Sequence, residues 1–195
     1  MANLVSRFAA AVFAVAIVAS PAFAADEHVG PMKELAKSGK MSWVADPIVI
    51  AAINKQNEKN AALSQGDIDK LDKEWRSEVK GSGGGLVNRV MSSELSAFLK
   101  KVKAESAGLF TEIFVMDNKG LNVGQSDKTS DYWQGDEAKW QKTYQQGAGM
   151  VHVGGIEKDE STQTLQSQLS ITIVDPASNK PIGAVTVGIN VEQLP

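Results

Sequence analysis

The chain has 195 residues, no cysteine and a formal net charge of −3, from 20 Lys and Arg against 23 Asp and Glu. The lack of cysteine excludes disulfides, thiolate metal sites and cysteine nucleophiles. The mildly acidic balance, without long runs of one sign, argues against nucleic-acid binding, which depends on clustered Lys and Arg against phosphates.

The N-terminus has the three parts of a cleavable secretory signal peptide. Arg7 precedes the apolar run Phe8–Val18, and the small residues Ala22 and Ala24 follow the helix-breaking pair Ser20-Pro21. This run is too short to span a bilayer, which takes about 20 apolar residues. We therefore predict cleavage after Ala24 and export to the periplasm of a product that is not membrane-embedded.

The remaining residues, 25–195, have the length of one domain with a core of its own. Helical patterns fill 25–106, and strand patterns fill 107–195. Asp46 as N-cap with Pro47 at the first helical position predicts a helix to about Glu58.

A second helix is predicted from the capping box that Ser64 forms with Asp67. The glycine-rich segment 81–85 must end that helix, and apolar residues recur at helical spacing again over 86–102. The N-terminal half is therefore expected to be mostly helical.

After about Ser106 the hydrophobic period changes to 2, which is typical of strands. Asp117–Gly120 supplies the turn residues of a hairpin, and a short amphipathic helix is predicted near 136–146. The predicted strands are Phe110–Met116, Leu121–Gly124, Met150–Ile156, Thr164–Val174 and Ile182–Val191. This order predicts an α+β fold, with N-terminal helices packed on one face of a five-stranded antiparallel sheet.

Four segments carry a resemblance to a known family. Asp159–Thr162, Leu169–Asp175 and Pro181–Asn190 look like paired final strands, and Ile113–Gly120 looks like a first hairpin. In these segments the sequence resembles the extracytoplasmic single Cache family of PAS-like sensor modules, which bind small metabolites. The resemblance implies a ligand site between the last strands and the segment that roofs them.

Family members usually continue into a membrane helix and a signalling domain, whereas this sequence ends at Pro195. The resemblance therefore implies a stand-alone periplasmic member without its own output domain, which would present its ligand to a periplasmic or membrane-protein partner. Many family members also pair through their N-terminal helices, so a homodimer is a further expectation.

The strand 164–174 alternates sharply between apolar and polar residues. Its polar side carries Gln166, Gln168 and Ser170, and we predict that these residues form a pocket wall, because buried amides and hydroxyls need partners. His152 of the preceding strand would face the same pocket. The alternative is a solvated sheet face, which antiparallel sheets often have.

The roof of the pocket is expected at 129–140, where aromatic rings alternate with charges. Such a mixture favours ligand binding, because rings bury carbon or stack on cations while charges fix polar ends. For Trp140 and Tyr144 the alternative is that they anchor the short helix to the core. The expected ligand-binding residues of the roof are Asp131, Tyr132, Trp133, Asp136 and Lys139.

No catalytic residue, metal site or cofactor is predicted. The chain has two histidines and lacks the G-x-S-x-G and H-E-x-x-H motifs, and the Asp117–Gly120 turn lacks the downstream ligands of a calcium loop. An acid/base pair among Asp131, Asp136 and Asp159 stays open, because sequence spacing does not place them together.

Two functions therefore compete. The first is a periplasmic sensory module that binds a small polar metabolite such as a carboxylate, an amino acid or an amine. The second is a structural or protein-interaction module that has lost its ligand, with a pocket filled by aromatic side chains and an exposed apolar patch elsewhere, expected along the N-terminal helices. An enzyme ranks third.

Overall fold

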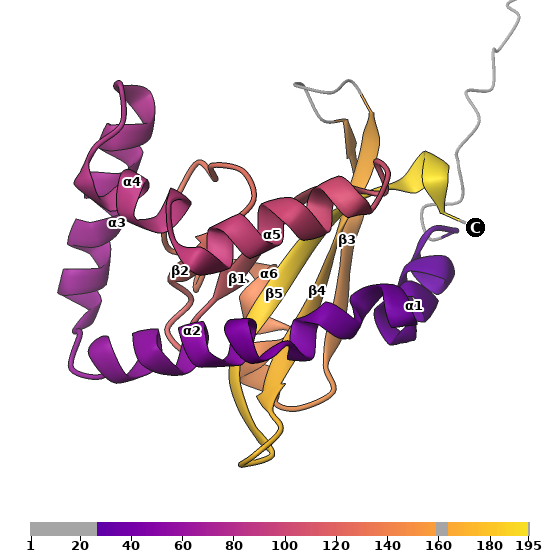
Figure 1. The fold of residues 1–195 in the computed structure, drawn as a ribbon, viewed down its shortest axis with the longest axis horizontal. Coiled ribbons are helices and arrows are strands. Elements are labelled where there is room, and N and C mark those ends of the chain that lie inside the picture. Colours follow the sequence, from indigo (N-terminus) through magenta and orange to yellow (C-terminus); the bar gives the residue numbers. More distant parts are fainter. Residues whose placement is uncertain (1–26, 159–163, 195) are drawn as a thin grey trace, which may run out of the picture.

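The computed structural model describes residues 27–158 and 164–194. The predicted signal peptide 1–24 and the Asp159–Thr162 motif lie outside these ranges. The described part is built on one five-stranded antiparallel sheet with the strand order β2-β1-β5-β4-β3 (Figure 1). The expected α+β fold class is thereby confirmed.

The strands form where the two-residue period predicted them. The expected bounds of the first strand are those observed, and the other four differ by a few residues at their ends. The strands are β1 (Phe110–Met116), β2 (Asn122–Gln125), β3 (Val151–Lys158), β4 (Leu165–Asp175) and β5 (Lys180–Asn190). The long strands β4 and β5 pair from Gln166↔Asn190 to Asp175↔Lys180 and form the centre of the sheet with β1.

Local capping sets the start of two helices, as predicted. The Asp46 side chain accepts a hydrogen bond from the Ile48 amide at 2.9 Å, and Ser64 and Asp67 form the reciprocal capping box. The helices are α1 (Val29–Lys37), α2 (Pro47–Lys59), α3 (Gln65–Lys80), α4 (Gly85–Met91), α5 (Glu94–Glu105) and α6 (Ala138–Gln141), with 3-10 turns at Gly39–Ala45, Tyr144–Gln146 and Val191–Gln193.

The helical stripe over 86–102 is divided into two helices, α4 and α5. Ser93 is the N-cap of α5, and its hydroxyl accepts a hydrogen bond from the Ser96 amide at 3.1 Å. Serine at this position offers the backbone an alternative to the continuous helical ladder, so the chain turns here. The short helix expected near 136–146 is likewise divided, into α6 and the 3-10 turn Tyr144–Gln146.

The two faces of the sheet are covered differently. Helices α1, α2 and α5 lie across one face, where they bury a large apolar core that includes Ile53, Leu99 and Val187, while α6 lies on the opposite face (Figure 1). Helices α3 and α4 extend beyond the β2 edge of the sheet and enclose a second apolar cluster around Trp75. The protein therefore has two apolar clusters on its helical side.

In the described part of the chain, no helix is both long enough and apolar enough to cross a membrane.

The close packing of β5 on β1 generates a stability prediction. A Cβ atom at Gly183 would overlap the carbonyl oxygen of Met116, which is backbone and cannot rotate away. We expect Gly183→Ala to lower the free energy of unfolding by about 1–3 kcal/mol, because overpacking forces strands apart. Urea titration of the two proteins measures this difference.

The matched control is Gly155→Ala in β3, where nothing lies within 4 Å of the added Cβ. This variant should stay within about 0.5 kcal/mol of the parent protein. Equal effects of the two substitutions would show that β1 and β5 are not packed as described.

Candidate functional site

A buried carboxylate organises the turn between β1 and β2. The Asp117 side chain is fully buried, and one of its oxygens accepts hydrogen bonds from the backbone amides of Lys119 at 2.8 Å and Leu121 at 2.9 Å. Gly120 completes this turn at φ +82°, a conformation that glycine adopts without strain. The turn residues predicted from sequence thus form a tightly bonded hairpin.

The second oxygen of Asp117 binds helix α2. It accepts hydrogen bonds from the side-chain amides of Asn60 at 2.9 Å and Gln56 at 3.0 Å. Asn57, on the same helix, donates to the Ile182 carbonyl at 2.8 Å and accepts from the Asn118 amide at 2.9 Å. These bonds fix α2 in position and rotation relative to the sheet.

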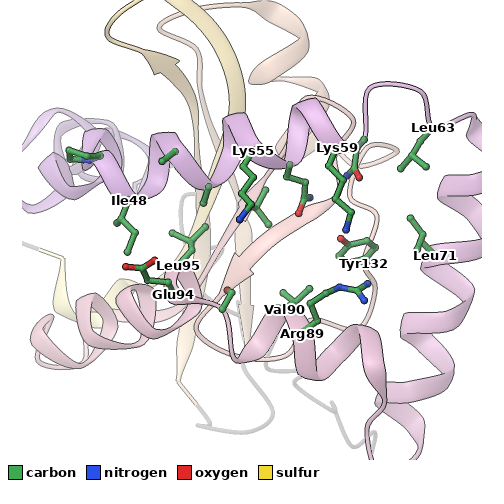
Figure 2. A pocket seen from close by; sticks show the side chains of 17 residues that line it. Ile48, Lys55, Lys59, Leu63, Leu71, Arg89, Val90, Glu94, Leu95 and Tyr132 are labelled. Atoms are coloured by element: carbon green, nitrogen blue, oxygen red, sulfur yellow. The ribbon is translucent and has the colours of Figure 1, made fainter.

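Between α2 and the facing helices α4 and α5 lies a cleft of about 910 Å³. Its lining comes from both apolar clusters, so it lies where the two clusters meet. Figure 2 shows the side chains from the two sides converging on it. The lining residues are Pro47, Ile48, Ala51, Ala52, Lys55, Gln56, Lys59, Asn60, Leu63, Leu71, Arg89, Val90, Ser93, Glu94, Leu95, Val123 and Tyr132.

The charges of this cleft are unbalanced. Lys55 and Lys59 lie one turn apart on α2, and Arg89 faces them from α4. The lining contains one acidic residue, Glu94. Within the described ranges, these four side chains take part in none of the ion pairs. Cations left unpaired around one cleft attract an anion, and Arg with Lys is the usual combination for a carboxylate or phosphate.

Tyr132 stands at the cationic end of the cleft. Its ring stacks on Trp75 with the centroids 5.4 Å apart, and its exposed fraction is 5%. Burial raises the pKa of its hydroxyl well above the usual range, and the nearby Arg89 opposes that rise. The hydroxyl is therefore neutral at physiological pH and able to donate a hydrogen bond into the cleft.

Tyr132 is the one expected site residue among the described residues that lines this cleft. Hydrogen bonds to Asp72 fix the backbone on which Tyr132 lies. The Asp72 carboxylate accepts hydrogen bonds from the backbone amides of Tyr132 at 2.9 Å and Trp133 at 3.1 Å. Arg76 bridges Asp72 at 2.6 Å and Asp131 at 3.3 Å, so Asp131 is engaged in an ion pair.

The other expected roof residues lie outside the cleft. Trp133 packs in the α3–α4 cluster and donates its indole N–H to the Lys119 carbonyl at 2.8 Å. Asp136 is exposed. Lys139 lies on the opposite face of the sheet, where it pairs with Glu137 at 2.9 Å and sits 5.2 Å above the Phe114 ring centre.

The polar residues expected on β4 bond to other strands of the sheet, Gln166 and Gln168 to β1 across β5, and Ser170 to β5 itself. Gln166 accepts a 2.6 Å hydrogen bond from the Thr111 hydroxyl, and Gln168 donates one to Glu112 at 2.9 Å. The Ser170 hydroxyl is 2.9 Å from that of Thr186. Cross-strand partners thus satisfy the polar groups for which a ligand was expected.

His152 pairs with Ser170 across β3 and β4 and is half-buried. Burial and the nearby Lys142 lower the pKa of its imidazole below the usual range, so the ring is neutral at physiological pH. On the same face, Trp140 and Tyr144 stack at 5.3 Å and pack over Phe114 and Ala184. These two aromatic residues anchor α6, which was the alternative considered for them.

Sequence reasoning missed the cations of the cleft. The sequence offers no pattern that joins Lys55, Lys59 and Arg89, because they belong to two helices that meet only in the folded chain. One local signal was present: the two lysines continue the face of α2 that carries the small residues Ala51 and Ala52. A helix with small residues and unpaired cations on one face leaves room beside it for an anion.

In comparisons with known proteins, no family model matches the chain. No curated protein matches it either.

Solved structures similar to the chain include sensor and ligand-binding domains. The ligand-binding domain of the Campylobacter jejuni chemoreceptor Tlp3 in complex with 4-methylisoleucine is 13% identical, over 86% of this chain and 61% of that chain, with a TM-score of 0.36. The V. cholerae histidine kinase DctB sensor domain is 13% identical, over 85% and 59%, with a TM-score of 0.37. The E. coli DcuS sensor domain is 14% identical, over 66% and 90%, with a TM-score of 0.38.

The chain thus spans about 60% of the length of the first two of these structures.

The bonds of Asp117 generate the prediction for this site. Asp117→Ala removes the acceptor of two backbone amides and two side-chain amides in a buried place. We expect a loss of about 2–4 kcal/mol in the free energy of unfolding, because buried donors are left unsatisfied. Urea titration followed by circular dichroism measures the loss.

Asp136→Ala is the control, since Asp136 is an exposed carboxylate. It should change the free energy of unfolding by less than about 0.5 kcal/mol. If the two variants were equally stable, Asp117 would not hold α2 to the hairpin.

Proposed function

We propose that this protein is a periplasmic ligand-binding sensory module whose ligand carries an anionic group, in the first place a carboxylate, and binds in the cleft between α2 and α4. The observation that carries the proposal is the convergence of Lys55, Lys59 and Arg89 on one cleft. None of these three side chains is in an ion pair with another residue of the described ranges.

The residues around the cations support the same function. The pocket is bounded by elements that hydrogen bonds fix to the sheet, so the cleft exists before a ligand arrives. The neutral Tyr132 hydroxyl adds a polar group next to the charges, and the amides of Gln56 and Asn60 hold α2 in place through Asp117. Of the polar metabolites considered from sequence, the excess of positive charge favours carboxylates over amines.

The remaining residues expected to contact the ligand receive other roles in this proposal. Asp131 and Trp133 support Tyr132, whereas Gln166, Gln168 and Ser170 stabilise the sheet. Export, a homodimer formed through the N-terminal helices, and action on a periplasmic or membrane-protein partner stay predictions.

The test is thermal unfolding at low ionic strength against carboxylates, amino acids, phosphate and amines of matched size. A carboxylate at a hundred times its Kd should raise the unfolding midpoint by roughly 5–10 °C, whereas amines should not. The double variant K59Q/R89Q should lose this response, because it removes two of the converging cations.

The matched control is K70Q/K101Q, which removes two exposed lysines of α3 and α5 that do not line the cleft. Both double variants should unfold within about 2 °C of the parent protein when no ligand is added. An unchanged carboxylate response in K59Q/R89Q would remove the cleft as the site, and an equal response to amines would contradict an anionic ligand.

A second candidate function is a protein-interaction module, and one observation favours it. Ile156 and Leu165 are 44% and 42% exposed on the neighbouring strands β3 and β4, in the part of this hairpin that projects beyond the helices (Figure 1). We propose that this pair contacts a second copy of the chain. Sedimentation velocity should then show a dimer that the variant I156S/L165S does not form, and a monomeric parent protein at high concentration would remove this candidate.

A further inference from the structure

The two ends of the cleft differ in chemistry. Lys59 and Arg89 flank Tyr132 at one end, and Ile48 lies with Leu95 at the other (Figure 2). Along α2 the distance from Ile48 to Lys59 is about 16 Å, at about 1.5 Å per residue. A ligand that fills the cleft is therefore much longer than a single carboxylate or phosphate group.

The part of the cleft away from Tyr132 is lined mainly by carbon. Leu95 lines this part from α5, and Ile48, Ala51 and Ala52 line it from α2, where Ala51 is exposed and Ile48 and Ala52 are half-buried. A small hydrophilic ligand bound at the cations would leave this apolar surface in water. An apolar body attached to the anion would bury it, at a gain proportional to the area covered.

Glu94 adds a restriction on the ligand. Its carboxylate lies at the Ile48 end of the cleft, away from Arg89 (Figure 2). A second negative charge on the ligand would meet this acid, and like charges in proximity cost binding energy. The far end of the cleft thus disfavours a dicarboxylate.

We infer that the ligand is an amphipathic monocarboxylate, with its carboxylate at Lys59 and Arg89 and its alkyl or aryl body along Ala51, Ala52 and Leu95. This inference rests on the proposed function and specifies the chemical class of its ligand.

The test is titration calorimetry of the purified protein with acetate, butyrate, hexanoate, octanoate and decanoate. Affinity is expected to rise by about four-fold for each added methylene until the apolar lining is covered. Octylamine, which has the octyl chain with a positive charge, should bind at least ten-fold more weakly than octanoate. Suberate, with a carboxylate at each end, should also bind more weakly, and Glu94→Gln should reduce that difference.

The variant Ala51→Phe fills the apolar lining from an exposed position of α2, where a larger side chain disturbs little of the core. It should abolish the gain in affinity with chain length and lower acetate affinity far less than octanoate affinity. Ala97→Phe, at an exposed position of α5 that does not line the cleft, is the matched control and should keep the full gain. Circular dichroism of each variant checks that it is folded.

The outcomes separate the two proposals. Carboxylate binding that is independent of chain length, or an unchanged gain in Ala51→Phe, overturns the amphipathic ligand and leaves the anion site in place. Failure of every carboxylate to bind overturns both. Equal binding of octylamine and octanoate also overturns the inference, because the chain would then bind without its carboxylate.

Discussion

The arrangement of this protein depends on the buried carboxylate of Asp117. Its side chain joins helix α2 to the β1–β2 hairpin through four hydrogen bonds, from two backbone amides and from the amides of Gln56 and Asn60. Its backbone carbonyl accepts a fifth, at 3.1 Å, from the Trp140 indole on the other face of the sheet. One residue at the end of a central strand thus links the helix layer, the sheet and α6. A charge buried so deeply is tolerated because its oxygens are hydrogen-bonded.

The bonds of Asp117 to α2 and to Trp140 bear on the position of the cleft, which lies on the helical side of the sheet. The Trp140 indole fixes α6 against Phe114 and Ala184, so aromatic carbon covers part of the opposite face. On the helical side, α3 and α4 enclose their own apolar cluster beyond the β2 edge. The side chains of the two apolar clusters do not fill the space between them. The cleft occupies this boundary, with α2 held on one side by Asp117 and Tyr132 held on the other by Asp72.

Features of the fold that depend on residues close in sequence could be predicted from the sequence. The cap at Asp46, the box of Ser64 with Asp67 and the strand Phe110–Met116 follow from spacing alone, and the structure contains all three. The break at Ser93 was missed, because the apolar stripe continues through it at helical spacing. Capping signals indicate a boundary more reliably here than periodicity does.

The site was harder to predict, because its groups meet only through the tertiary structure. The alternation of β4 correctly separated polar from apolar residues, but sequence does not reveal whether a polar side chain finds its partner in a ligand or across the sheet. Gln168 and Ser170 find partners in Glu112 and Thr186. Conversely, Lys59 and Arg89 belong to different helices, and only the arrangement of α2 against α4 brings them to one cleft. Tyr132 was expected at the site because it is an aromatic residue close in sequence to charged ones, and in the structure it lines the cleft.

The charges of the cleft differ in sign from the charge of the chain as a whole. The chain has a net charge of −3, yet the cleft is lined by three cations and one acid. Acidic partners are plentiful in this sequence, and Arg76, only one helix away, engages two of them. Exposed cations without an ion pair also occur elsewhere in the described part of the chain, so the feature particular to the cleft is the grouping of three of them, Lys55, Lys59 and Arg89. Cations grouped without such partners draw anions towards the cleft over a distance of about 8–10 Å at physiological salt. Under the proposed function, burial of the apolar lining adds affinity only for an anion that carries carbon to cover it.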